Sequence, residues 1–329
     1  MRDHPIRALS RGSWRGRRRI WDGCAGGRSP VTRLSACAGK RLEDGAMYRL
    51  DGKRVVITGA GSGLGRALSL ALASRGCRIG VADINEETAA ETLALIREKG
   101  GDGEVFKVDV SDPQEVEAMA EHFFREWGGV DILVNNAGVV SVGFVGDIPL
   151  ADWEWVFGIN FWGMLYGCHS FIPRMKAQGG GYIVNVASAA GLLTLLEMAP
   201  YNTTKAAVIA LSETLKSELA PFKIGVTAVC PMFFNTHLLD NMRYTDEFER
   251  EFSRTTFQYA RMTPDEVAAA VVRGVEKRRL YVVPQFSGKL FWFLKRMRPG
   301  IYHGTLAFFN RDDIGRRMLL WMARKGLIQ

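Results

Sequence analysis

The chain has 329 residues, 47% of them hydrophobic, which is enough for one large domain or two small ones with a sizeable core. Its net charge of +8 is uneven: residues 1–46 carry +7 and residues 273–329 carry +10, whereas residues 47–272 hold 19 basic and 28 acidic side chains, a net −9. This acidic body argues against nucleic-acid binding, and five scattered cysteines without metal-ligand spacing predict a reducing, cytoplasmic setting and no metal.

The first 46 residues are rich in Arg, Gly and Ser and show no sustained apolar period. They lack the apolar core of a secretory signal, although an Arg-rich, acid-poor leader is also typical of organellar transit peptides. The ordered pattern begins directly after Met47. We therefore predict that residues 1–46 are a disordered basic extension, or that they precede the true start of the protein.

A glycine-rich turn follows the first predicted strand. Residues 55–57 are a continuous β-branched run, typical of a strand covered on both faces, and a helix is predicted from residue 66. Between a strand and a helix, glycines allow close approach of a pyrophosphate, and the helix N-terminus offers it free N–H groups. The predicted cofactor-binding residues of this turn are Gly59, Gly61, Ser62, Gly63, Leu64 and Gly65.

Asp83 ends the second predicted strand, 18 positions after Gly65. A carboxylate at this position can accept hydrogen bonds from both ribose hydroxyls of adenosine, and it repels a 2′-phosphate. The sequence therefore favours NAD as the cofactor, with NADP as the alternative.

Helices and strands alternate along the rest of the chain. Helices are predicted over 86–99, 113–127, 153–175 and 200–219, and strands over 104–110, 130–134, 182–187, 223–229 and 281–284. This alternation predicts an α/β fold with a single Rossmann-like, doubly wound domain over 47–285, in which helices cover both faces of a parallel sheet of about seven strands. Residues 231–262 break the alternation and form the predicted substrate loop.

Tyr201 and Lys205 lie four residues apart on a predicted helix and so share one helix face. A free tyrosine has a pKa of about 10, and a fixed positive charge beside it favours the tyrosinate and lowers that pKa. Ser188 precedes the tyrosine by thirteen residues and can hold a substrate oxygen against the phenol.

These motifs, in this order, resemble the short-chain dehydrogenase/reductase family over about residues 50–285. The resemblance rests on the turn at 58–65, Asp109-Val110, the Asn-Asn-Ala-Gly run at 135–138, Asn160, Ser188 and the Tyr201–Lys205 pair. It implies an NAD(P)-dependent oxidoreductase that interconverts an alcohol and a carbonyl. It further implies that Tyr201 is the general acid and base, that Lys205 lowers its pKa and binds the nicotinamide ribose, that Ser188 orients the substrate, and that Asn160 holds a water that links Lys205 to solvent.

The resemblance also implies further cofactor contacts and an assembly. The contacts fall on Asp109, Val110, Asn136, Ala137, Gly138, Pro231, Phe234 and Thr236, besides Tyr201 and Lys205. Met232 stands where the family usually has glycine, which leaves the backbone path after Pro231 open. Helices 153–175 and 200–219 commonly form the family's oligomer interface, so a homodimer or homotetramer is expected. An NADPH-dependent carbonyl reductase and a catalytically idle binding protein on the same fold are the alternatives.

The predicted substrate loop is strongly apolar, as is the run at 192–198. The apolar loop residues are Met232, Phe233, Phe234, Leu238, Leu239, Met242, Tyr244, Phe248, Phe252 and Phe257. They favour a lipophilic small-molecule substrate such as a steroid, a retinoid or another lipid-like alcohol or ketone. The competing interpretation is that they pack the loop itself or an oligomer interface.

Residues 286–329 form a basic, amphipathic C-terminal extension beyond the predicted domain. Aromatic side chains beside basic ones can lie in a membrane interface, so peripheral membrane contact is one interpretation. The other is that the extension packs on the body of the protein or on a partner subunit.

Overall fold

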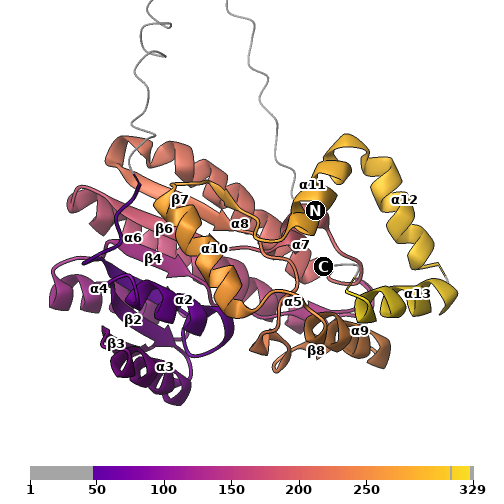
Figure 1. Ribbon diagram of the computed structural model, residues 1–329, viewed down its shortest axis with the longest axis horizontal. Helices are drawn as coiled ribbons and strands as arrows, with labels where there is room; N and C mark the ends of the chain where they lie inside the picture. Colours follow the sequence, from indigo (N-terminus) through magenta and orange to yellow (C-terminus); the bar gives the residue numbers. More distant parts are fainter. Residues whose placement is uncertain (1–46, 312, 327–329) are drawn as a thin grey trace, which may run out of the picture. The chain divides into compact units, whose positions relative to one another are not determined.

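The computed structural model describes residues 47–311 and 313–326, and the predicted extension over 1–46 lies outside them. Seven parallel strands form one sheet in the order β3-β2-β1-β4-β6-β7-β9 (Figure 1). The strands are β1 (Arg54–Thr58), β2 (Arg78–Asp83), β3 (Asp102–Lys107), β4 (Ile132–Asn135), β6 (Gly181–Val186), β7 (Ile224–Val229) and β9 (Tyr281–Val282). The predicted doubly wound fold is confirmed.

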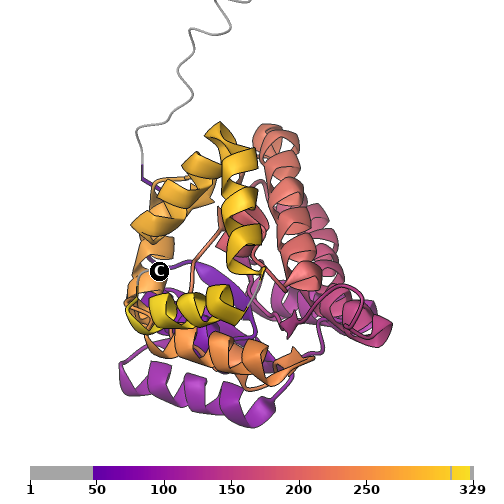
Figure 2. The same ribbon diagram turned by 90° about the vertical axis from the view of Figure 1, so that its right-hand side faces the viewer.

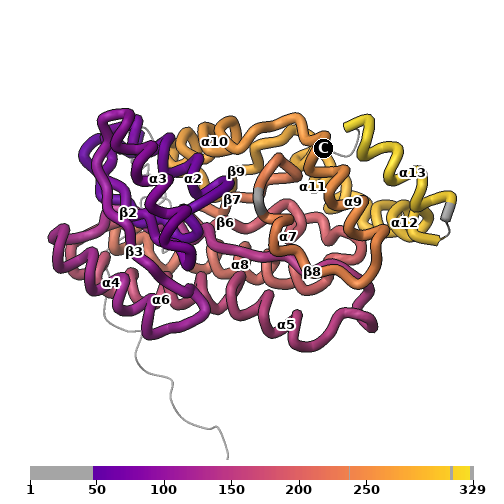
Figure 3. Tube along the Cα trace, turned by 90° about the horizontal axis from the view of Figure 1, so that it is seen from below, coloured from indigo at the N-terminus to yellow at the C-terminus, as the bar shows by residue number. Residues whose placement is uncertain are grey.

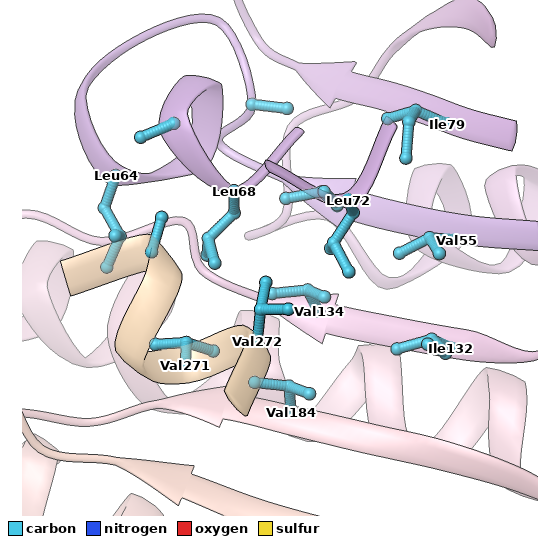
Figure 4. Packing of buried hydrophobic residues seen from close by; sticks show 14 of the residues in the cluster. Val55, Leu64, Leu68, Leu72, Ile79, Ile132, Val134, Val184, Val271 and Val272 are labelled. Atoms are coloured by element: carbon cyan, nitrogen blue, oxygen red, sulfur yellow. The ribbon is translucent and has the colours of Figure 1, made fainter. Parts of the chain in front are cut away.

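Helices cover both faces of this sheet, which lies between two helical layers (Figure 3). One layer holds α2 (Gly63–Ala73), α3 (Glu86–Glu98) and α10 (Pro264–Glu276), and the other holds α4 (Pro113–Trp127), α6 (Met164–Ala177) and α8 (Ala199–Glu218). Figure 4 shows the first interface, where Leu68 of α2 and Val271 of α10 pack over Val134. The central strands β1 and β4 contain the apolar runs 55–57 and 132–134 because they are buried on both faces, whereas the edge strand β3 is polar and partly exposed.

The order of the strands places the ligand-binding edge. From β1 the chain winds outward to β2 and β3, and it then returns to place β4 on the other side of β1. In open α/β sheets, ligands bind beyond the carboxyl ends of the strands at such a reversal. The glycine turn after β1, Asp83 at the end of β2 and Asn136 after β4 all lie at this edge.

The predicted helix over 153–175 is continuous but irregular. It comprises α5 (Leu150–Phe157), a π-helical turn (Gly158–Gly163) and α6. Asn160 lies fully buried within the π turn. Single π turns inside α-helices are rare and frequently mark functional sites.

Beyond β9, the described residues up to 326 form three further helices, drawn in orange to yellow in Figure 2. They are α11 (Phe286–Met297), α12 (Pro299–Phe309) and α13 (Asp313–Arg324), which follow α7 (Ala189–Leu193) and α9 (Glu247–Gln258) in the sequence. Helix α11 packs against α7, and α13 packs against α9. A separate small sheet is formed by β5 (Ser141–Val142), which pairs in parallel with β8 (Arg243–Tyr244).

Candidate active site

The glycine turn is held in a tight conformation by its own backbone and by Asn136. Gly59 has a φ of +63°, which favours glycine, and a Cβ on Gly65 would collide with the carbonyl oxygen of Gly59. The Asn136 amide donates hydrogen bonds to the carbonyls of Thr58 (2.9 Å) and Gly59 (3.0 Å). Asn136 therefore ties the end of β4 to the turn, in addition to lining the cavity described below.

The N-terminus of α2 is prepared for an anion. Its N-cap residue, Ser62, makes no side-chain capping bond, and its first turn contains no acidic residue. By contrast, the N-caps of α3 and α4, Asn85 and Asp112, both accept backbone N–H bonds. The free N–H groups and the positive dipole end of α2 therefore fit the pyrophosphate of a dinucleotide.

A cavity of about 260 Å³ runs along this edge of the sheet. The predicted cofactor residues that line it are Gly59, Ser62, Gly63, Leu64, Asp83, Asp109, Val110, Asn136, Ala137, Gly138, Tyr201, Lys205, Pro231, Phe234 and Thr236. Gly61 and Gly65 do not line it, because their part is to shape the turn. Sequence reasoning missed Ile84, Val108, Val139, Ile159, Val186, Ala187 and Asn241, and it assigned Leu238 to the substrate. Most of these adjoin a predicted residue or end a strand, which is the signal that could have found them.

Asp83 lies at one end of this cavity and is held by two backbone groups. Its carboxylate accepts hydrogen bonds from the N–H of Gly61 (2.8 Å) and of Asn85 (3.0 Å). The nearby cation, Arg66, is engaged elsewhere, since its guanidinium donates to the carbonyl of Gly61 and pairs with Glu91. The cavity therefore presents a fixed carboxylate at the place where an adenosine ribose would bind.

Tyr201 and Lys205 both line this cavity, and Ser188 lies beside Tyr201 without lining it. Tyr201 is only 8% exposed, and the Ser188 hydroxyl lies close enough to its phenol to act on the phenol's pKa. Lys205 is buried, and its ammonium lies 5.6 Å from the Tyr201 ring centroid and donates to the carbonyl of Val186 (2.9 Å). Ser188 is also the N-cap of α7, where its Oγ accepts the N–H of Ala190. The three predicted residues are thus brought together.

That Lys205 lowers the pKa of Tyr201 stays a prediction, because burial dominates the pKa of both groups in this structure. Burial raises the pKa of Tyr201 to about 12, and the neighbouring Ser188 hydroxyl opposes this rise only in part. Burial also lowers the pKa of Lys205 to about 8. The four-residue spacing predicts that Tyr201 and Lys205 share one helix face. It does not predict that both side chains are buried.

The side chain of Asn160 is hydrogen-bonded to the backbone of Val139. Its side-chain oxygen accepts the N–H of Val139 and its amide donates to the carbonyl of the same residue, both at 2.8 Å. Both polar ends of the side chain therefore hold the segment after β4, next to Gly138 and Lys205. Its part in a proton relay stays a prediction.

A second, larger cavity of about 410 Å³ lies beside the first and is strongly apolar. Predicted substrate-loop residues supply part of its lining, namely Met232, Phe233, Leu239, Met242, Phe248, Phe252 and Phe257. The run at 192–198 supplies Leu193, Leu195, Leu196, Glu197 and Met198. Phe234 and Leu238 line the first cavity instead, and Tyr244 lines neither.

The C-terminal extension completes the lining of the second cavity. Sequence reasoning did not predict this contribution of the extension. Its lining residues are Phe291, Leu294, Ile301, Tyr302, Thr305, Leu306, Phe309, Asn310, Leu319 and Met322. The extension is joined to the body by polar contacts: the ammonium of Lys295 donates to the carbonyl of Leu192 (2.8 Å), and Arg316 pairs with Glu197 (2.9 Å). An amphipathic pattern indicates a packed face, but it does not say which cavity that face closes.

Met232 is where the extension and the substrate loop fit together. The N–H of Met232 donates to the side chain of Gln285 (2.9 Å), and a Cβ on Gly288 would lie 2.9 Å from Cγ of Met232. A glycine in α11 thus makes room for the methionine that stands where the family usually has glycine. The backbone path left open by the sequence is fixed by this contact, and Pro231 and Thr236 still reach the first cavity.

The strand order, the glycine turn and the first cavity define a dinucleotide-binding protein of the α/β class. A family model described as short chain dehydrogenase matches residues 53–247, more than half of the chain, and the chain belongs to the short-chain dehydrogenase/reductase family. The predicted membership is confirmed.

Relatives and solved structures agree with this assignment. The chain is 38% identical over 234 residues to the probable oxidoreductase EphD of Mycobacterium tuberculosis, covering 68% of this chain but only 40% of that relative's length. It is 31% identical over 265 residues to the putative oxidoreductase SadH of the same species, covering 79% of this chain and 96% of SadH. A short-chain dehydrogenase/reductase from Burkholderia phymatum, solved in complex with NAD, is 32% identical with a TM-score of 0.74, covering 78% of this chain and 96% of that one.

Proposed function

We propose that this protein is an NAD-preferring oxidoreductase that interconverts a lipophilic alcohol and its carbonyl. The observation that carries the proposal is the position of Tyr201 between the two cavities. Its side chain lines the first cavity, and it packs in one cluster with Val140 and Val142, which line the second. A substrate held in the apolar cavity would thus bring its oxygen to the phenol.

The side chains at this junction divide the chemistry between them. A nicotinamide, when bound, supplies or accepts the hydride, so the protein needs to orient the substrate and transfer one proton. The Ser188 and Tyr201 hydroxyls are neighbours, so both can bind one substrate oxygen. The phenol is protonated at neutral pH and can give its proton to a carbonyl oxygen in the reduction, and it takes the proton back in the oxidation. Burial keeps competing water away from both groups.

The residues of the first cavity fit a nicotinamide dinucleotide. The uncapped N-terminus of α2 would bind the pyrophosphate, Asp83 the adenosine ribose, and Asp109 and Val110 would border the adenine. Lys205 would bind the ribose next to the nicotinamide. A carboxylate at the Asp83 position disfavours a 2′-phosphate, which supports NAD over NADP.

Replacing Asp83 with alanine is expected to lower the preference for NAD over NADP by at least tenfold, because the change removes the negative charge that repels the 2′-phosphate. The ratio of kcat/KM values for the two cofactors measures the preference. Asp102→Ala serves as a control. Asp102 lies on the edge strand β3, where its carboxylate pairs with Arg78 of β2, and it does not line the first cavity. A wild type that already prefers NADP would contradict this assignment of Asp83.

The lining of the second cavity supports a neutral, lipophilic substrate. Its carboxylates are Glu197 and Glu249, and both are already paired. Glu197 bonds Arg316, while Glu249 accepts hydrogen bonds from Thr245 and from the N–H of Asp246. The remaining lining is almost entirely aliphatic and aromatic, so it favours a ligand without charge.

A screen of lipophilic alcohols, sterols and retinoids included, tests the proposal as a whole. Each alcohol is offered with NAD and with NADP, and the absorbance of the reduced cofactor reports turnover. We expect turnover with NAD and bulky alcohols. Alcohols that bind tightly without turnover would instead point to a binding protein on this fold.

The Leu306→Trp substitution is expected to raise KM for bulky alcohols by tenfold or more and to leave small alcohols unaffected. Leu306 lines the second cavity from α12, and the larger side chain would fill space that a bulky substrate needs. Ala307→Trp is the matched control, because the neighbouring residue is exposed and does not line the cavity. Equal effects on both substrate sizes would argue against this cavity as the substrate site.

A further inference from the structure

Helix α11 presents an apolar stripe to solvent along its whole length. Five large apolar side chains follow the spacing i, i+4, i+7, i+8 and i+11, and all of them are exposed: Phe286, Leu290, Phe293, Leu294 and Met297. The opposite side of the helix, with Gly288, Phe291 and Trp292, packs on the body. A surface helix normally turns polar residues outward, so both sides of α11 are built for apolar contact.

Helix α12 extends this surface. Ile301 is 69% exposed and Phe308 is 63% exposed, and the two lie seven residues apart on one side of α12. Figure 2 shows α11 leading into α12. We call the surface made by these two residues and the α11 stripe the α11–α12 face.

The second cavity opens onto this face. Among the residues that line the cavity, all of which lie in the described part of the chain, the exposed ones are Leu294, Ile301 and Thr305. All three belong to α11 or α12, whereas the rest of the lining is buried or half-buried. A molecule can therefore pass between the cavity and whatever covers the α11–α12 face.

The charges around the face are of one sign. Residues 286–311 contain five basic side chains and no acidic one. Lys289 and Arg296 are exposed, lie seven residues apart and follow one edge of the α11 stripe, and Arg298 is exposed just beyond it. An apolar centre with basic edges matches an anionic lipid surface, in which apolar side chains enter the interface and cations meet the headgroups.

A second copy of the chain is a poorer match for the same surface. A contact between two copies through the α11–α12 face would bring together two surfaces of the same positive sign, which costs energy. No helix in residues 47–311 or 313–326 is long and apolar enough to cross a membrane. A lipid contact of the described chain would therefore be at the surface of the bilayer.

We propose that the α11–α12 face docks on an anionic lipid surface and that the second cavity exchanges its ligand directly with that surface. The docking stands on exposure and charge alone, whereas the exchange rests on the proposed function. A lipophilic ligand is most concentrated in the lipid. Docking would bring that lipid next to the exposed cavity residues of α11 and α12, where the exchange takes place.

Co-sedimentation of the full-length protein with vesicles tests the docking. We use vesicles of phosphatidylcholine alone and vesicles that contain roughly 30% phosphatidylserine, and we expect binding to the second kind that weakens as salt is added. Phe293→Glu and Met297→Glu should each weaken binding at least tenfold, and Lys289→Gln should weaken it about fivefold. Phe222→Glu is the matched control, because it places the same charge at a 42% exposed phenylalanine outside the face and should leave binding unchanged.

Three outcomes would overturn the docking: no binding to either kind of vesicle, binding that Phe293→Glu leaves intact, or equal losses in Phe293→Glu and Phe222→Glu. If Phe293→Glu instead breaks a wild-type oligomer that does not bind vesicles, the face belongs to a second copy. Sedimentation needs no turnover, so its result is independent of the proposed function.

The exchange is tested by delivering one alcohol in anionic vesicles and the same alcohol in detergent micelles. Phe293→Glu should lower turnover several-fold in vesicles and leave it unchanged in micelles. Equal turnover from vesicles in the variant and the wild type would overturn the exchange, while turnover itself would still support the proposed function.

Discussion

Tyr201→Phe is expected to lower kcat by roughly 10³-fold in both directions of the reaction, because it removes the hydroxyl that transfers the substrate proton. NAD binding should stay close to that of the wild type, since the ring remains and the groups at the glycine turn are untouched. The phenol hydroxyl meets Ser188 in a buried site, so no water replaces it readily. Steady-state turnover and the quenching of protein fluorescence by the cofactor measure the two effects separately.

Tyr281→Phe is the matched control for this experiment. Tyr281 lies on β9, and its hydroxyl donates to Glu213, so the same atom is removed outside both cavities. We expect its turnover to remain within a few-fold of the wild type. If Tyr201→Phe retained comparable turnover, proton transfer would have to be assigned to another group, and the proposed function would lose its central residue.

The parts of the site that the sequence predicted correctly depend on local structure. The turn at 58–65 is defined by glycines between a strand and a helix, and each of these features is written in neighbouring residues. Asp83 was found because it ends an apolar strand, and parallel strands bring their carboxyl ends to one edge. The alternation of strands and helices likewise predicts the layers of the fold, because each helix must cover one face of the sheet.

The parts that were missed depend on contacts between distant segments. Met232 and Gly288 are far apart in the sequence, and only packing shows that one makes room for the other. Helix α11 is apolar on both sides, so its pattern alone cannot tell the packed side from the exposed one. The complete burial that raises the pKa of Tyr201 could not be predicted from helical spacing, because burial is a property of the whole fold.

Lys205→Met is expected to stabilise the cofactor-free protein at neutral pH while lowering kcat by roughly 10²-fold. Burial lowers the pKa of Lys205 from 10.5 to about 8, so below pH 8 the folded state holds a buried ammonium at a cost of roughly 3 kcal/mol. Removing it also breaks the hydrogen bond to the carbonyl of Val186, worth about 1 kcal/mol. The net gain of roughly 2 kcal/mol should raise Tm by several degrees.

The gain in stability of Lys205→Met over the wild type should depend on pH. Between pH 8 and 10.5 the unfolded chain binds a proton at Lys205 that the folded chain does not, so the stability of the wild type should rise with pH across that window. The advantage of Lys205→Met should therefore be largest below pH 8 and vanish towards pH 10.5. Lys216→Met makes the same change at a half-exposed position of α8 and should show neither effect. A Lys205→Met variant that is less stable than the wild type at pH 7 would contradict this prediction. It would mean that the buried ammonium of Lys205 stabilises the folded protein.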